Sequence, residues 1–225
     1  MFSGKIEDYI LFEDKEIIVC RKPAGIAVQN ARIGAMDLES SLKNYLAMQD
    51  GGGRRIPYLA VIHRLDQPVE GILVFGKTPE AAKSLSAQIT AGKMEKIYLA
   101  VTYGKQAEAG KKEKVLEDYL KKDGKSNTSS VVNAHTPGAK KARLSYEVLG
   151  EAVDAISGKK KWLLRIHLDT GRHHQIRVQM AHAGMPLAGD LKYGAGTNVT
   201  IGAGSLALCA ASLTFFHPVT GKMMK

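Results

Sequence analysis

Cysteine and long apolar runs are both scarce in this sequence. Its 225 residues include two cysteines, Cys20 and Cys209, which stand far apart and form no Cys-x-x-Cys pair. A disulfide framework or a zinc site is therefore not expected, and a reducing compartment fits. The N-terminus carries charges where a signal peptide needs an apolar run, and the longest mostly apolar stretch, 206–216, is too short to cross a bilayer. The sequence thus predicts a cytoplasmic protein without a membrane segment.

Motifs for cofactors and metals are missing as well. The glycines form no Gly-x-x-x-x-Gly-Lys-Ser/Thr phosphate loop, and no Gly-x-Gly-x-x-Gly follows an expected strand. The histidines form no His-x-x-x-His or His-Glu-x-x-His pair, and His174 and His182 are eight residues apart. We therefore expect no ATP, NAD or other nucleotide cofactor, and no catalytic metal.

Positive charge is what the sequence has in excess. Its formal net charge is +10 and its pI is near 9.5. Such an excess suggests a polyanionic partner, most commonly nucleic acid, although many basic proteins simply expose a solvated basic face. The hydrophobic content of 44% is ordinary for a soluble globular protein. The length suits one domain or two small lobes with a buried core.

Short strands and helices follow one another without a regular βαβ rhythm. Apolar runs and period-two alternation predict strands, two within 9–25 and one each within 56–62, 71–77, 95–104, 143–149 and 161–168. Helical spacing predicts helices within 36–49 and 78–93, the second capped by Thr78. A third, short helix should follow the turn at Thr170-Gly171 and end at Gly184 and Pro186.

Three other segments lack a clear period. Residues 104–142 are polar and lysine-rich, so we expect loops with weak strands there, and the lysines of 111–125 read as packing or solvated surface. Residues 51–55 read as a flexible basic loop, and 206–218 as either a helix or a strand. The mixture of elements favours an α+β fold with a largely antiparallel sheet.

The segment 61–71, VIHRLDQPVEG, ends an apolar run in charged residues. The carboxylate of Asp66 follows Arg64 and His63, and a carboxylate near a cation tends to stay ionised. An ionised, partly desolvated aspartate can attack carbon and form a covalent intermediate. An aspartate in a turn before a proline, however, commonly bonds its own backbone. Taken alone, this segment favours the turn over the nucleophile.

Two later segments offer partners for such a carboxylate. Tyr98 lies opposite the apolar face of its expected strand, where a ring can stack on a base or a hydroxyl can move a proton. A half-buried strand tyrosine is the commoner arrangement. Arg177 falls in the first turn of the expected helix, where it can bind a carboxylate or a phosphate. The alternative, an exposed basic helix start, is disfavoured by the helix dipole. Further donors stand nearby at Arg172, His174 and Gln175.

Several motifs, in this order and rough spacing, resemble the RluA-type family of RNA pseudouridine synthases. They are HRLD (63–66), KIYLA (96–100), GRHHQIR (171–177) and GDLKYG (189–194), with an opening KPAG and a closing FFHPVTG. The resemblance covers nearly the whole chain. It implies an isomerase that converts uridine in ribosomal or transfer RNA to pseudouridine. Because the isomerisation has no net redox change and no leaving phosphate, the resemblance implies no cofactor.

The resemblance also implies a role for each matched residue. Asp66 would be the nucleophile, Tyr98 would stack on the uracil and take part in proton transfer, and Arg177 would pair with Asp66. Arg64 would help to open the RNA around a flipped nucleotide, since a stacked uridine is out of reach of a side chain. The remaining expected RNA contacts are His63, Arg172, His174 and Gln175.

The implied fold is α+β, with a mixed, mainly antiparallel central sheet, flanking helices and a catalytic cleft. We expect a single catalytic domain over 1–225, in one or two lobes, without a separate S4-like RNA-binding domain, and we expect a monomer. One segment departs from the family pattern: members usually follow HRLD with Thr-Ser-Gly, whereas Val69 and Glu70 precede Gly71 here. That departure supports the alternative of a non-catalytic RNA-binding protein on the same fold.

Overall fold

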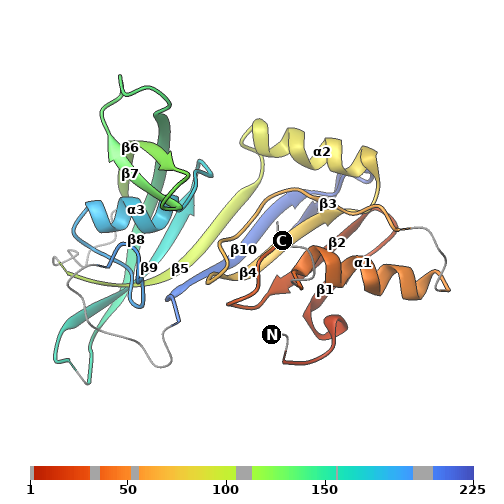
Figure 1. Ribbon diagram of the computed structural model, residues 1–225, viewed down its shortest axis with the longest axis horizontal. Coiled ribbons are helices and arrows are strands. Elements are labelled where there is room, and N and C mark those ends of the chain that lie inside the picture. The colour runs from red at the N-terminus through yellow and green to blue at the C-terminus, as the bar shows by residue number, and fades with distance from the viewer. Residues whose placement is uncertain (1–2, 31–35, 52–55, 105–112, 156, 195–204) are drawn as a thin grey trace. The chain divides into compact units, whose positions relative to one another are not determined.

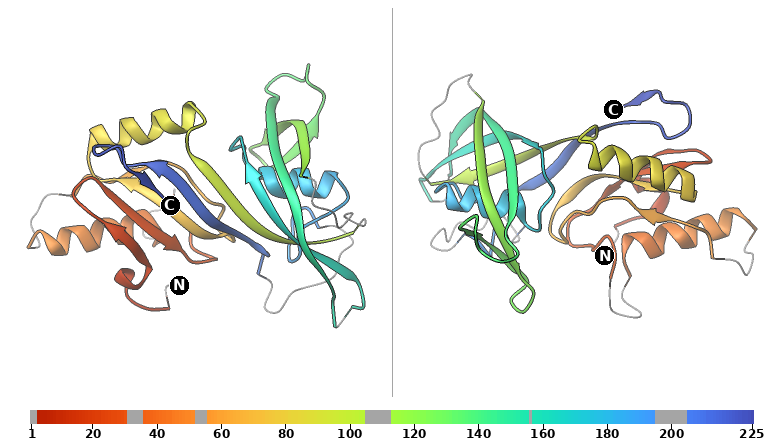
Figure 2. Two further views of the ribbon diagram at one scale, coloured as in Figure 1. Left: turned by 180° about the vertical axis from the view of Figure 1, so that it is seen from behind. Right: turned by 90° about the horizontal axis from the view of Figure 1, so that it is seen from above.

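The computed structural model describes residues 3–30, 36–51, 56–104, 113–155, 157–194 and 205–225. Within this part of the chain, three α-helices accompany a sheet system of mostly antiparallel strands (Figures 1 and 2), which confirms the α+β prediction. The chain divides into two compact units, Met1–Glu95 with Ala210–Lys225 and Lys96–Cys209. It passes from the first unit to the second within β5 (Glu95–Tyr103) and returns within β10 (Leu208–Phe216).

The first unit is built on short strands, mostly in antiparallel pairs, and a 3-10 helix, Ile6–Tyr9, precedes the first of them. Its strands run in the order β1, β2, β4, β10, with β3 pairing to β4 and β11 to β10. The strands other than β10 are β1 (Ile10–Glu13), β2 (Ile17–Lys22), β3 (Ala60–Val61), β4 (Glu70–Gly76) and β11 (Met223–Met224). The segment 206–218, ambiguous between helix and strand, is therefore strand β10 over most of its length.

Two helices cover the sheet of the first unit from opposite sides (Figure 1). Helix α2 (Pro79–Thr90) buries Ala81 and Leu85 in a core with apolar residues of β2, β4 and β10. Helix α1 (Leu38–Gln49) buries three leucines one turn apart, Leu38, Leu42 and Leu46. Each helix starts at a capping side chain. Thr78 Oγ1 accepts from the Ala81 N–H at 3.2 Å, as predicted, and Asp37 accepts from Ser40 at 2.7 Å.

The second unit is a five-stranded antiparallel sheet in the order β5, β9, β8, β6, β7. Its other strands are β6 (Lys114–Asp123), β7 (Thr128–Val132), β8 (Lys140–Val153) and β9 (Lys160–Leu168). The expected alternation on β9 is confirmed, since the four apolar residues of one face are buried: Trp162, Leu164, Ile166 and Leu168. The predicted short helix is α3 (Gln175–His182), and it packs Val178 against Leu120 and Ala142.

The expectation of loops with weak strands across 104–142 was wrong. Strand β6 has ten residues and forms a regular hairpin with β7, from Tyr119 opposite Val132 to Asp123 opposite Thr128. It also pairs with β8 along its other edge. Pairing along β6 supplies its backbone hydrogen bonds, and α3 covers one face, so few apolar residues are needed. Residues 105–112 of this segment lie outside the described part, as do 52–55 of the expected glycine-rich loop.

Candidate active site

Asp66 lies in the first unit, in the connection between β3 and β4, and it is half-buried. The connection is a turn, because the Val69 N–H donates to the Asp66 carbonyl at 3.0 Å. Arg64 is exposed, whereas His63 is half-buried and its Nε2 accepts from the Val74 N–H of β4 at 3.5 Å. The HRLD segment is thus an anchored loop with one cation facing solvent.

A buried lysine ties this loop to the turn after β2. Lys22 is fully buried, and its ammonium donates to three carbonyls, those of Pro23 at 3.0 Å, Ile26 at 2.7 Å and Gln67 at 3.0 Å. Burial lowers the pKa of Lys22 to about 8, and the charges of Asp66 and Glu70 act in the opposite direction. Sequence reasoning missed Lys22, although a lysine between an apolar strand and a proline was a visible signal.

Gln67 completes the tie from the other side. Its carbonyl accepts from the Gly25 N–H at 2.9 Å, and its side-chain Nε2 donates to the Gly25 carbonyl at 3.0 Å. Gly25 has a φ of +85°, which glycine adopts without strain. Lys22 and Gly25 therefore hold Gln67, the residue that follows Asp66. These three residues are here called the Asp66 clasp.

Packing accounts for part of the segment that departs from the family pattern. Val69 is buried and Glu70 is exposed at the start of β4. Gly71 has a φ of +136°, and a Cβ there would overlap the backbone of Ala210. The retained glycine is therefore required by a close approach of β4 to β10. Nothing in the structure explains why Glu70 replaces a small hydroxyl residue.

Tyr98 lies in the second unit, on β5 opposite Ile166 of β9, and its side chain is 6% exposed. It shares its face of the strand with Ala100 and Thr102, which are also buried. The residues of the other face, Ile97, Leu99 and Val101, are half-buried. The face with Tyr98 is therefore the more deeply buried one, although the sequence suggested that the apolar residues lay opposite to it.

Arg177 is buried in the second unit, where a carboxylate holds it in a forked contact. Its Nε donates to Asp190 Oδ2 at 2.8 Å and its Nη2 donates to Asp190 Oδ1 at 2.7 Å. The Tyr193 ring lies under the guanidinium, 5.2 Å from Cζ to the ring centroid. Burial alone would raise the pKa of Asp190, but the hydrogen bonds and charge of Arg177 hold it below its usual range. The alternative reading of Arg177, an exposed basic residue at the start of a helix, is thereby excluded.

Asp190 and Tyr193 belong to the GDLKYG motif, but their contacts with Arg177 were not predicted from the sequence. The Asp190 carboxylate also accepts from the backbone N–H groups of Lys192 at 2.9 Å and Tyr193 at 3.2 Å. These bonds shape the 189–194 segment into a turn around the carboxylate. An aspartate directly after glycine, in a motif that follows the arginine helix, was the available signal.

The other residues expected at RNA differ in their surroundings. Gln175 is buried, and its side chain bonds to Thr170, the Arg172 N–H and the Arg143 carbonyl. His174 is buried, has a φ of +53°, and bonds through Nδ1 to the Tyr193 hydroxyl at 2.8 Å. Arg172 is exposed, with Nε donating to the Lys141 carbonyl at 2.9 Å. These contacts favour a supporting role for His174 and Gln175 and leave Arg172 accessible.

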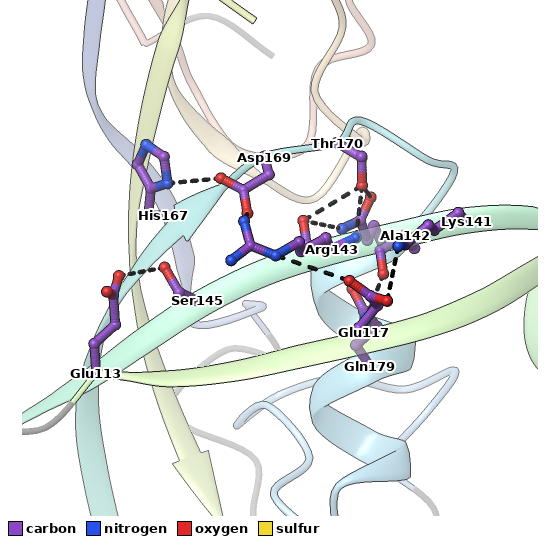
Figure 3. A network of polar contacts seen from close by, with 11 residues as sticks. Glu113, Glu117, Lys141, Ala142, Arg143, Ser145, His167, Asp169, Thr170 and Gln179 are labelled. Atoms are coloured by element: carbon purple, nitrogen blue, oxygen red, sulfur yellow. Dashed lines mark hydrogen bonds and ion pairs between the residues drawn. The ribbon is translucent and has the colours of Figure 1, made fainter.

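A network of polar side chains holds the loop before α3 to the sheet (Figure 3). Arg143 bridges Asp169 at 2.5 Å and Glu117 at 3.9 Å, and Lys141 pairs with Glu117 at 2.8 Å. His167 Nδ1 lies 3.0 Å from the Asp169 carboxylate. Because the basic residues of this network are matched with acids, it stabilises the loop rather than offering uncompensated charge.

The described residues contain no group of three or more His, Cys, Asp or Glu side chains placed to hold a metal ion. Nor do they contain a helix of the length and apolar character needed to span a membrane.

Comparison with known proteins places this geometry in a family. Residues 16–182 match the family model described as RNA pseudouridylate synthase. The chain is 33% identical over 232 residues to ribosomal large subunit pseudouridine synthase D of Pseudomonas aeruginosa, covering 98% of this chain and 67% of that protein. The protein of the same name from Xanthomonas campestris is 30% identical over 234 residues, covering 96% and 64%. This chain therefore spans only about two thirds of the length of these relatives.

Solved structures agree on the fold. The human protein named RNA pseudouridylate synthase domain containing 1 superposes with a TM-score of 0.76 at 20% identity, covering 100% of this chain and 84% of that chain. A second human protein, named RNA pseudouridylate synthase domain containing 4, superposes with a TM-score of 0.70 at 21% identity. The match covers 93% of this chain and 85% of that chain. With most of the sequence matched by the family model, this chain belongs to the RNA pseudouridylate synthase family.

Proposed function

We propose that this protein isomerises uridine in RNA to pseudouridine, with Asp66 as the nucleophile. The observation that carries the proposal is a half-buried carboxylate, on a loop fixed by the Asp66 clasp, inside the region that matches the family. A fixed nucleophile loses little entropy on reaching its target, which is how positioning lowers a barrier.

The proposed reaction moves the base without consuming anything. The Asp66 carboxylate forms a covalent bond, either to C6 of the uracil or to C1′ of the ribose, and the N1–C1′ bond breaks. The base turns, the C5–C1′ bond forms, the proton on C5 is removed, N1 gains a proton and the aspartate is released. Tyr98 stacks on the uracil and its hydroxyl takes part in that proton transfer. Reactant and product have the same atoms, so no cofactor is required, and activity should survive EDTA.

Arg177 is proposed as the basic residue of the catalytic set, offering a guanidinium held in one orientation. Support comes from the way that Asp190 and Tyr193 fix the guanidinium, because a fixed arginine offers its donors in one direction. Arg64 and His63 belong to the Asp66 loop, and we propose that exposed Arg64 contacts the RNA as the uridine leaves its stack. Exposed Arg172 is proposed as a further contact, whereas His174 and Gln175 support the loop.

The proposed partner is RNA, bound by a cytoplasmic monomer. The names of the two bacterial relatives mention the large ribosomal subunit, so ribosomal RNA is the first substrate to test and transfer RNA the second. Incubation of the purified protein with each RNA, followed by pseudouridine mapping, tests the activity. RNA binding without any pseudouridine would favour the non-catalytic alternative.

The role of Asp66 is tested by Asp66→Asn, with Asp50→Asn as the control because Asp50 is an exposed carboxylate at the end of α1. We expect the Asp66 variant to bind RNA and form no pseudouridine, and the Asp50 variant to react as the wild type does. Product formation by the Asp66 variant at the wild-type rate contradicts the assignment.

A further inference from the structure

The β6–β7 hairpin carries three lysines that the proposed reaction does not use. Lys121 and Lys122 lie near the end of β6, Lys125 lies in the turn, and all three are exposed. Within the described residues, none of them is in an ion pair with an acidic side chain. Several basic residues elsewhere in this sheet, in contrast, are matched: Lys141 with Glu117, Arg143 with Asp169 and Arg165 with Glu147.

One acidic residue stands among these lysines. Asp123 accepts from the Lys125 N–H at 2.9 Å and from Ser126 Oγ at 2.7 Å, so its carboxylate shapes the turn. Three lysines and one aspartate leave a net charge of +2 over residues 121–125. The hairpin end is therefore a site of uncompensated positive charge, here called the lysine tip (Lys121, Lys122 and Lys125).

The lysine tip is fixed beside the Arg177 site within the second unit. His173 bonds through Nδ1 to Ser129 Oγ at 2.9 Å and through Nε2 to Asn127 Oδ1 at 3.1 Å. The Ser129 N–H donates to the Tyr193 hydroxyl at 2.8 Å, and Lys192 Nζ donates to the Asn127 carbonyl at 2.8 Å. Figure 1 shows α3 alongside β6 and β7. The hairpin end is thus bonded to the segments that hold Arg177.

The strand register puts the lysines on more than one side of the hairpin. Lys122 pairs with Ser129 and shares a face with Leu120, which packs on Val178 of α3. Lys121 pairs with Ser130 and points to the opposite face. Long flexible ammonium groups on both faces can follow a backbone of phosphates without a fixed geometry.

We propose that the lysine tip binds phosphates of the RNA strand flanking the target uridine. This rests on the proposed function, because a flipped nucleotide needs its neighbouring strand held while the base is out of its stack. The lysines would contribute affinity and positioning in the ground state, with no contact to the reacting atoms. An acidic protein partner is the competing occupant, and it predicts no effect on RNA binding.

The test removes the three charges and measures the salt dependence of RNA binding. The variant is Lys121→Gln/Lys122→Gln/Lys125→Gln, and the matched control is Lys83→Gln/Lys93→Gln/Lys222→Gln, three exposed lysines of the first unit. The probe is a transcript of bacterial large-subunit ribosomal RNA. Losing three phosphate contacts should reduce the magnitude of the slope of log K against log [salt] by about 2, given about 0.7 per phosphate on single strands.

We expect the tip variant to bind RNA more weakly and to show the reduced slope. The control variant should keep the wild-type slope, and both variants should have the melting temperature of the wild type. The amount of pseudouridine formed at saturating RNA should not change. An unchanged slope in the tip variant overturns the inference, as does an equal loss in the control, which would report net charge alone. Tight, salt-dependent binding without pseudouridine contradicts the proposed function instead, and the slope still decides the role of the lysine tip.

Discussion

Asp190 holds the guanidinium of Arg177 by two hydrogen bonds, at 2.8 Å from Nε and 2.7 Å from Nη2, and the two side chains are 0% and 5% exposed. A buried arginine placed this way keeps one orientation because its fork matches the carboxylate. Two backbone N–H groups share the same carboxylate. The pair therefore fixes both the arginine and the turn that follows α3.

Removal of the Asp190 charge should strongly destabilise the protein. Asp190→Ala removes the carboxylate that the buried Arg177 guanidinium contacts through two hydrogen bonds, and breaking a buried pair costs about 3–5 kcal/mol. Glu147→Ala is the control, because its pair with Arg165 is exposed and worth about 0–1 kcal/mol. Urea unfolding of the two variants gives the comparison. Equal losses would show that the buried pair contributes no more than a surface pair.

Lys22 should make stability depend on pH in the alkaline range. Its pKa in the folded protein is about 8, below the ordinary value of about 10.4, so between these values the unfolded chain binds more protons. Stability due to Lys22 should therefore rise as pH increases from about 8 to about 10.4. Unfolding free energies of the wild type and Lys22→Met, measured across this range, should move apart with that sign.

The buried thiol of Cys20 also makes stability depend on pH, so its effect has to be separated from that of Lys22. Burial raises the pKa of its thiol to about 12, so its titration lowers stability as pH rises above the usual thiol range. Because the charge of Lys22 also acts on Cys20, both proteins are compared in a Cys20→Ala background, and their difference then reports Lys22. A difference that stays constant from pH 7 to 10.4 would show that the lysine pKa is not lowered.

Tyr98 should separate stacking from proton transfer. Tyr98→Phe keeps the ring and removes the hydroxyl, so RNA affinity should persist while the rate falls, by about 100-fold or more if the hydroxyl moves the proton. Tyr98→Ala should also weaken binding, by about 1–3 kcal/mol per lost stacked base. Tyr119→Phe on β6 is the matched loss of a hydroxyl. A wild-type rate for Tyr98→Phe removes the proton-transfer role.

Gly71 should tolerate alanine far less well than another glycine with positive φ. Its Cβ would overlap the Ala210 backbone, whereas Gly92 has a φ of +65° and nothing within 4 Å of a Cβ. Gly92→Ala should cost about 1–2 kcal/mol from its backbone conformation. Gly71→Ala should add a further 1–3 kcal/mol or so from overpacking. Similar melting temperatures for the two variants would mean that β4 and β10 separate easily.

The elements that the sequence predicted well were those with strong local signals. Thr78 and Pro79 predicted the start of α2, and the alternation around Leu164 predicted β9. Both signals are local, because helix capping and side-chain period depend on neighbouring residues alone. Strand β6 was missed because its buried residues are few and its stability comes from β7, β8 and α3. Such long-range pairing leaves little trace in local hydrophobicity.

The site shows the same division. Asp66, Tyr98 and Arg177 could be selected from motifs and from the chemistry of their side chains. Asp190 and Lys22 gave only weak local signals, because their importance lies in which distant groups they contact: an arginine thirteen positions away, and a carbonyl 45 positions away. Spacing along a sequence does not reveal such contacts.

The Asp66 clasp has a consequence for transplanting this chemistry. The acceptors of Lys22 are all main-chain carbonyls, so the loop's position is encoded by the path of two backbones and by one ammonium. Grafting HRLDQ alone onto another scaffold would move the carboxylate without the Lys22 hydrogen bond that fixes its loop. A graft that keeps the loop in place needs two peptides, 20–26 and 63–68, together with strand β2, which buries the Lys22 ammonium.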